Sequence, residues 1–279
     1  MFKNNIYMVI FKEEDHSYRN RYNGNKYISV TTFIKDFYEP YDESYWLRYK
    51  ACEAMMGGQK KDSNGKYLKL KGFYTLVMKS GLDIIEKTYL ENKRYHEIIE
   101  EIRLQWKTNN KESTDKGTEY HLNKEKELID SGVWNGLKVH PKPKGYDNIS
   151  REMNEDGVYP ELLLFNNKYM IAGQSDRVIK EGNYVDILDY KTNKKLEFES
   201  YKHKKMFEPF EKFDDCSFNH YSIQLSLYGF MLEDFGYTVR KIEIEHKDKM
   251  YPVNFCKDEV YKALEIKRGH LSPLKSVLN

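Results

Sequence analysis

A carboxylate and an ammonium group lie two residues apart in the stretch VDILDYKTN, residues 185–193. The apolar run before them predicts a strand that enters a core, and Asp189 and Lys191 lie where that strand ends. On its own, such a pair is more often a surface ion pair than a catalytic site. The neighbouring strands must therefore show whether other reactive groups lie beside it.

Three consecutive strand-like runs predict an antiparallel meander, joined by turns at residues 166–167 and 181–182. The predicted opposite pairs are Glu161 with Ala172 and Asp176 with Ile187. Because side chains alternate between the two faces of a sheet, one face then carries three carboxylates and one ammonium group, from Glu161, Asp176, Asp189 and Lys191. A four-residue turn would preserve this arrangement, whereas a three-residue loop would reverse it.

Clustered carboxylates on a half-buried face repel one another and lose hydration. A divalent cation relieves both costs, and hard oxygen ligands suit Mg²⁺ or Mn²⁺, which also bind phosphate oxygens. The pattern therefore predicts that Asp189 holds a metal ion while Lys191 contacts a water molecule or a phosphate.

The motifs GQSD (173–176) and DYK (189–191) resemble the signature of the PD-(D/E)XK nucleases. Three further motifs resemble the RecB-like branch, which includes CRISPR-associated adaptation nucleases and mitochondrial genome maintenance exonucleases. These motifs are GTEYH with His121, PE with Glu161, and QLSLY with Gln224 and Tyr228. The segment YISVTTFI, residues 27–34, is similar to the lead-in of phage-type members.

The resemblance implies an α/β fold with a restriction-endonuclease-like core of helix, three-strand meander, helix and strand. The residues predict the same order independently: a helix from about 115–117 to Gly132, the meander, a helix that ends at Gly236, and a strand at 239–246. We expect two parts. Residues 1–112 would form an N-terminal hairpin and a helical region that packs on or arches over the core, and residues 113–279 the nuclease core with a C-terminal helix.

The resemblance also implies roles for individual residues. Asp176, Asp189 and the backbone carbonyl of Tyr190 would hold one or two Mg²⁺ or Mn²⁺ ions, completed by His121. Glu161 would act through a bound water or as a further ligand, and Lys191 would orient water or stabilise the transition state. Residues expected to position DNA or support these groups are Gln224, Tyr228, Glu125 and Thr192.

Composition limits the remaining function classes. Lys plus Arg (46) nearly balance Asp plus Glu (44), so a nucleic-acid surface must be local. The three cysteines lack metal-binding spacing, which predicts no iron–sulfur cluster although several relatives carry one. No apolar run is long enough to span a membrane, and the N-terminus is unlike a signal peptide, which predicts a cytoplasmic protein.

The predicted function is hydrolysis of DNA phosphodiester bonds by an exonuclease that acts on single strands or DNA ends, with a replication or recombination protein as a partner. A structure-specific endonuclease, a ribonuclease and a non-catalytic binding module that kept the fold remain alternatives. The segments 68–79 and 199–207 carry Tyr and Lys side chains that could contact a strand, although a solvated helix face is the slightly favoured interpretation of each.

Overall fold

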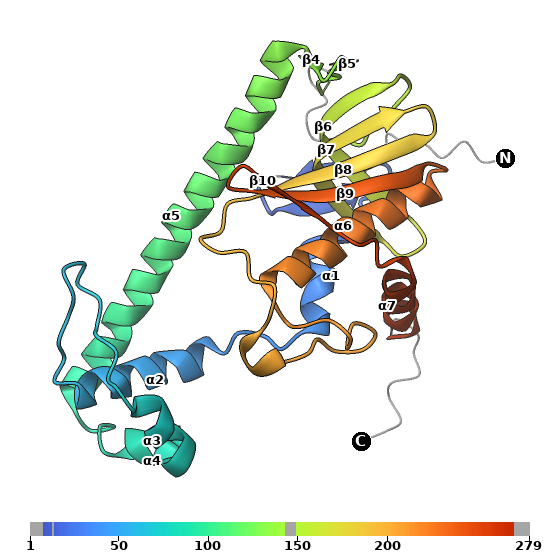
Figure 1. Cartoon of the computed structure of the whole chain (residues 1–279). Helices are drawn as coiled ribbons and strands as arrows, with labels where there is room; N and C mark the ends of the chain where they lie inside the picture. The colour runs from blue at the N-terminus through green and yellow to red at the C-terminus, as the bar shows by residue number, and fades with distance from the viewer. Residues whose placement is uncertain (1–7, 13, 143–148, 271–279) are drawn as a thin grey trace. The chain divides into compact units, whose positions relative to one another are not determined.

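The computed structural model describes residues 8–12, 14–142 and 149–270 (Figure 1). Contacts divide the chain into two compact units, one of Met1–Glu39 with Gly117–Asn279 and one of Pro40–Lys116. The prediction grouped residues 1–112, whereas contacts group the N-terminal strands with the larger unit.

The larger unit is built on a mixed sheet of eight strands. Seven follow one another in the spatial order β1-β2-β3-β7-β8-β9-β10, and β6 pairs with β7. The strands are β1 (Val9–Lys12), β2 (Ser17–Asn20), β3 (Lys26–Ser29), β6 (Gly157–Asn166), β7 (Ile171–Glu181), β8 (Tyr184–Lys191), β9 (Thr238–His246) and β10 (Lys249–Pro252). The N-terminal segment forms three strands, in which β2 pairs antiparallel with both β1 and β3, so it has one strand more than the predicted hairpin.

Strand β7 organises the sheet. Antiparallel β6 pairs with it from Ile171 to Lys180, whereas its opposite edge is shared by two strands. Parallel β3 pairs at Ile171 and Ala172, and antiparallel β8 pairs from Arg177 onwards. Residues 173–176, which include the GQSD motif, therefore lie where β3 has ended and regular pairing with β8 has not begun.

Both predicted turns are slightly misplaced, so the pairing register differs from the predicted one by two residues between β7 and β8 and by four residues between β6 and β7. The β7–β8 turn is formed by Gly182 and Asn183, and the β6–β7 connection comprises the four residues 167–170. The register brings Glu161 level with Asp176, because the flanking pairs are Pro160 with Arg177 and Leu162 with Ser175. The true register therefore brings the acids closer than the predicted one.

Three helices cover one face of the sheet. α1 (Val30–Ile34), α6 (Ser217–Asp234) and α7 (Lys257–His270) pack with sheet side chains in one hydrophobic cluster. Ser29 caps α1, because its hydroxyl accepts a hydrogen bond from the Thr32 amide. α6 is followed by Gly236, whose φ of +94° suits the end of a helix.

The helix predicted to begin near residues 115–117 begins much earlier. α5 runs without interruption over Lys93–Ser131, so Gly117 lies inside it. The predicted end at Gly132 is correct, and this glycine has a φ of +66°. A β-carbon on Gly117 would lie 3.2 Å from the Thr192 hydroxyl oxygen, so the small residue permits a close approach rather than a helix start.

A short hairpin follows α5. It consists of β4 (Val133–Trp134) and β5 (Leu137–Lys138). β5 lies in the stretch 135–148, which we expect from its sequence to be a loop. Residues 143–148 of that stretch lie outside the described residues.

The smaller unit is helical. α2 (Glu43–Met56), α3 (Phe73–Ser80), α4 (Leu82–Lys87) and the first part of α5 enclose a separate hydrophobic cluster. Asp42 caps α2 by accepting a hydrogen bond from the Tyr45 amide. The segment between α2 and α3 includes residues 57–66, where the sequence GGQKKDSNGK predicts a break between helices.

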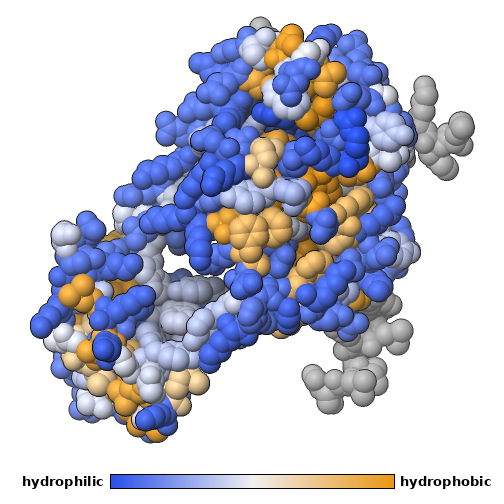
Figure 2. All heavy atoms as spheres, in the orientation of Figure 1, coloured by the Kyte–Doolittle hydropathy of each residue, from blue (hydrophilic) through white to orange (hydrophobic). Residues whose placement is uncertain are grey.

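Charged residues make up 32% of the chain, and the face drawn in Figure 2 is accordingly mostly hydrophilic. Hydrophobic side chains gather on that face over the sheet, with smaller patches on the helical unit. Among the described helices, none combines the length and apolarity needed to cross a membrane.

Candidate active site

Three of the predicted site residues converge from three elements. His121 comes from α5, Glu161 from β6 and Asp176 from β7, and one potential ligand atom from each lies within 4.8 Å of the others. His121 Nδ1 and Asp176 Oδ1 are 3.2 Å apart, and Gln174 Nε2 donates a hydrogen bond of 2.6 Å to Glu161 Oε2. An imidazole nitrogen and two carboxylates are a common donor set for divalent metals.

The strand that carries Glu161 is irregular at that residue. Glu161 has a φ of +49°, which is uncommon for a residue with a β-carbon. On either side of it, Tyr159 and Leu162 pack into the same hydrophobic cluster, although residues three apart on a regular strand point to opposite faces. The uninterrupted alternation assumed from the sequence is therefore wrong here, and the irregularity aims the carboxylate of Glu161 at Asp176. Such strain is typical of functional sites.

Asp176 also binds the neighbouring strand through its side chain. The Tyr190 amide donates a hydrogen bond of 2.6 Å to Asp176 Oδ2, just beyond the last regular pair, Arg177 with Leu188. The Asp176 carboxylate therefore accepts the hydrogen bond that a backbone carbonyl of β7 would accept if the regular pairing of β7 with β8 continued. This bond fixes the end of β8, and with it the positions of Asp189 and Lys191.

Lys191 is held by groups from β8 and α6. Its ammonium forms an ion pair with Asp189, lies 3.3 Å from Gln224 Oε1 and lies 4.5 Å from the centre of the Tyr221 ring. Gln224 Nε2 in turn donates to the Tyr228 hydroxyl at 3.0 Å. Asp189 is 2% exposed, so this pair is closed to solvent on most sides.

The acids perturb one another strongly. Burial, together with the charges of Asp176 and Glu125, raises the pKa of Glu161 to about 8, against the opposing effects of Lys142 and His121. Burial and the charge of Asp176 also raise the pKa of Asp189, against the opposing effect of Lys191. The cluster therefore holds more negative charge than its surroundings compensate.

The basic groups respond in the opposite sense. Burial lowers the pKa of His121, but its hydrogen bond to Asp176 and the nearby carboxylates outweigh burial and raise it. The pKa of Lys191 is likewise raised, because the charges of Asp189 and Asp176 outweigh burial. Lys191 thus stays charged at neutral pH.

A pocket of about 390 Å³ opens onto the cluster. His121 and Glu161 line it together with Phe11 from β1. Glu125, expected to support the site, also lines this pocket and forms an ion pair of 3.2 Å with Lys142. A small part of a substrate can therefore reach the potential metal ligands from solvent.

The structure divides the predicted residues into two adjoining groups. His121, Glu161 and Asp176 form the potential ligand cluster, whereas Asp189 lies with Lys191, Gln224 and Tyr228 on the α6 side. Thr192 is exposed and close to Gly117.

Two residues that contact the site were given no predicted role. Gln174 lies two residues before Asp176, on the sheet face that strand periodicity predicts for both. Tyr221 lies three residues before Gln224, so helix periodicity could have found it.

The chain matches the model of the PD-(D/E)XK nuclease superfamily over residues 71–257. It therefore belongs to this superfamily, whose restriction-endonuclease-like fold agrees with the mixed sheet and flanking helices described above. Members are nucleases that use divalent metal ions, so the chain is a hydrolase of the nuclease class.

No curated protein sequence matches the chain. Among solved structures, a protein from Eubacterium rectale named "Putative exonuclease" is similar, with 13% identity and a TM-score of 0.32, covering 88% of this chain and 79% of that one. The family assignment rests on the match to the family model.

Proposed function

We propose that this nuclease hydrolyses DNA phosphodiester bonds and acts as an exonuclease on single strands or DNA ends. The convergence of His121, Glu161 and Asp176 beside the Asp189–Lys191 pair carries the proposal. The motif resemblance to the RecB-like branch supports an exonuclease in replication or recombination. We further propose that it acts in the cytoplasm, or in a host cytoplasm if phage-encoded, beside a protein of one of these processes.

The residues fit a divalent cation, and we propose Mg²⁺ or Mn²⁺. The observation that supports this fit is the burial of mutually repelling acids. Burial and the charges of Asp176 and Glu125 raise the pKa of Glu161 to about 8, and a bound cation would relieve both costs. Asp176, His121 and Glu161 would hold one ion, with Asp189 and the Tyr190 carbonyl as ligands of the same or a second ion. A bound ion stabilises charge on the phosphate and acidifies water.

Lys191 would act as a positioned cation. Its raised pKa makes it a poor base at neutral pH, so it would donate hydrogen bonds to the attacking water or to a phosphate oxygen. Gln224 restrains the ammonium, and the hydrogen bond from Gln224 to Tyr228 restrains Gln224. In this scheme Asp189 both neutralises Lys191 and fixes its direction.

The test follows 5′- and 3′-labelled single- and double-stranded DNA in Mg²⁺, Mn²⁺ or EDTA. Wild type should release short products from one end of the DNA, and it should do so in Mg²⁺ or Mn²⁺ but not in EDTA. Lys191→Ala should lower kcat by at least 100-fold. Lys195→Ala is the matched control, because Lys195 is highly exposed and pairs only with Glu197 among the described residues. It should keep wild-type activity.

The outcomes separate the alternatives. Cleavage of a circular single strand would indicate an endonuclease, and cleavage confined to RNA would remove DNA as the substrate. Binding without cleavage in both metals would refute the enzyme and favour a binding module.

A further inference from the structure

The helical unit contains an aromatic platform that the proposed active site does not use. Trp106 on α5 is half-buried, with its ring packed against the hydrophobic cluster of this unit. The ring of Tyr41 lies at 61° to it with a centroid distance of 6.2 Å, and Tyr41 is 65% exposed. A fixed indole beside an exposed phenol leaves aromatic surface available to a planar ligand.

Basic side chains accompany this platform. Arg103, Trp106 and Lys107 follow the helical spacing i, i+3 and i+4, so they lie on one stripe of α5. Together with Tyr41 and Glu43 they line a pocket of about 710 Å³. The pocket thus combines aromatic faces with two cations and one acid.

The cations of this pocket are available to a ligand. Lys107 is exposed and forms no ion pair with any residue in the described part of the chain. Arg103 forms an ion pair with Glu100, but the two side chains are 47% and 68% exposed. Surface ion pairs of this kind contribute little free energy, so Arg103 can leave Glu100 to contact a phosphate.

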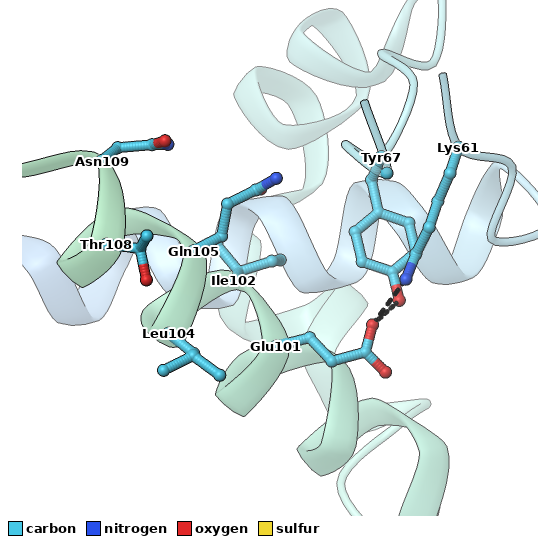
Figure 3. A pocket seen from close by; sticks show the side chains of 9 residues that line it. Lys61, Tyr67, Glu101, Ile102, Leu104, Gln105, Thr108 and Asn109 are labelled. Atoms are coloured by element: carbon cyan, nitrogen blue, oxygen red, sulfur yellow. Dashed lines mark hydrogen bonds and ion pairs between the residues drawn. The ribbon is translucent and has the colours of Figure 1, made fainter. Parts of the chain in front are cut away.

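A neighbouring pocket in the same unit shows the contrast (Figure 3). There, Lys61 and the Tyr67 hydroxyl both contact the carboxylate of Glu101, at 2.8 and 2.6 Å. Arg94 also donates to Glu101, at 2.6 Å. Its charges therefore satisfy one another, which leaves little electrostatic attraction for a ligand.

We propose that the pocket at Tyr41 and Trp106 binds an unpaired nucleotide of single-stranded nucleic acid. The base would stack on Trp106 beside Tyr41, and Arg103 and Lys107 would contact the adjoining phosphates. Duplex DNA does not fit this chemistry, because its bases are stacked and paired. The inference rests on the proposed function in so far as the bound strand is the substrate.

Binding is measured separately from cleavage, with the full-length protein in EDTA. The probe is a fluorescein-labelled oligothymidylate, and anisotropy gives its Kd beside that of a blunt duplex of equal length. Trp106→Ala should raise the Kd for the single strand about tenfold and leave the Kd for the duplex unchanged. Tyr41→Ala should raise the single-strand Kd severalfold, and Trp106→Phe should retain most of the affinity.

The phosphate contacts are tested by salt. Arg103→Ala with Lys107→Ala should reduce the slope of log Kd against log salt concentration by about 1.4, because each phosphate contact contributes about 0.7 on single strands. Lys111→Ala removes one charge from an exposed position on the same helix and should change the slope by less than half as much.

The proposal fails if Tyr41→Ala, confirmed as folded by its melting temperature, and the double basic variant both bind the single strand as wild type does. Equal weakening of duplex binding would also overturn it. If binding depends on Trp106 but the protein cleaves nothing, the pocket stands and the proposed nuclease reaction falls. The same anisotropy measurement with a labelled oligouridylate shows whether the pocket prefers RNA. A lower Kd for the oligouridylate than for the oligothymidylate would refute DNA as the preferred ligand.

Discussion

Replacing Glu161 by Gln should stabilise the metal-free protein, and the gain should grow with pH. Burial, together with the charges of Asp176 and Glu125, raises the pKa of Glu161 from 4.5 to about 8. Gln has nearly the same shape without the charge, and it can still accept the hydrogen bond that Gln174 donates to Glu161. The variant therefore removes mainly an electrostatic cost.

The sign and size of this effect follow from linkage. Below pH 4.5 Glu161 is protonated in both the folded and the unfolded chain, so its ionisation costs nothing. Between pH 4.5 and about 8 only the unfolded chain loses the proton, and wild-type stability falls as pH rises. One pKa unit corresponds to about 1.4 kcal/mol, which sets an upper limit near ~5 kcal/mol. Because Glu161 retains some contact with solvent, we expect about 2 to 3 kcal/mol.

Urea unfolding in EDTA at pH 5 and pH 8.5 measures the difference. Glu161→Gln and wild type should differ little at pH 5 and by the stated amount at pH 8.5. Glu127→Gln, at an exposed position of α5, is the control and should differ little at either pH. A variant no more stable than wild type at pH 8.5 would refute the electrostatic account of this cluster. Saturating Mg²⁺ should reverse the order, because the variant lacks one ligand.

Three other predictions concern the acid cluster and the elements that hold it in place. Mg²⁺ should bind wild type more tightly at pH 8.5 than at pH 6.5 and release protons on binding, because it must displace the proton of Glu161; calorimetry in two buffers of different ionisation enthalpy measures both. Gly173→Ala should cost about 1 to 3 kcal/mol in urea unfolding and lower kcat, because a β-carbon would lie 2.6 Å from the Tyr228 ring; unchanged stability and kcat would contradict this packing. Ser29→Ala should cost about 1 kcal/mol by removing the cap of α1, whereas Ser29→Asp should retain most of it; thermal unfolding compares the two.

Much of the core could be predicted from local sequence. The strands and the helices that follow residue 132 are encoded by apolar periodicity and by glycines such as Gly236, which act over a few residues. The motif residues were named from type and order alone, because the chemistry of metal-bound phosphate needs carboxylates and a cation at strand ends. Local signals failed for α5, because Asp115 to Gly117 predict a helix start inside a helix that begins at Lys93. A contact with Thr192, 75 residues away, explains that glycine better.

Only the tertiary structure decided how the site is assembled. The sequence predicted that four reactive side chains share one face, with the strand register two and four residues out. The structure shows instead an irregular β6 at Glu161, and Lys191 held from α6 through Gln224 and Tyr221. Register and strand irregularity depend on which strands pair and on the packing of both faces, and these energies arise only once distant segments meet. The sequence alone therefore determined which chemical groups the site has, and the fold decided how far apart they lie and how strongly they perturb one another.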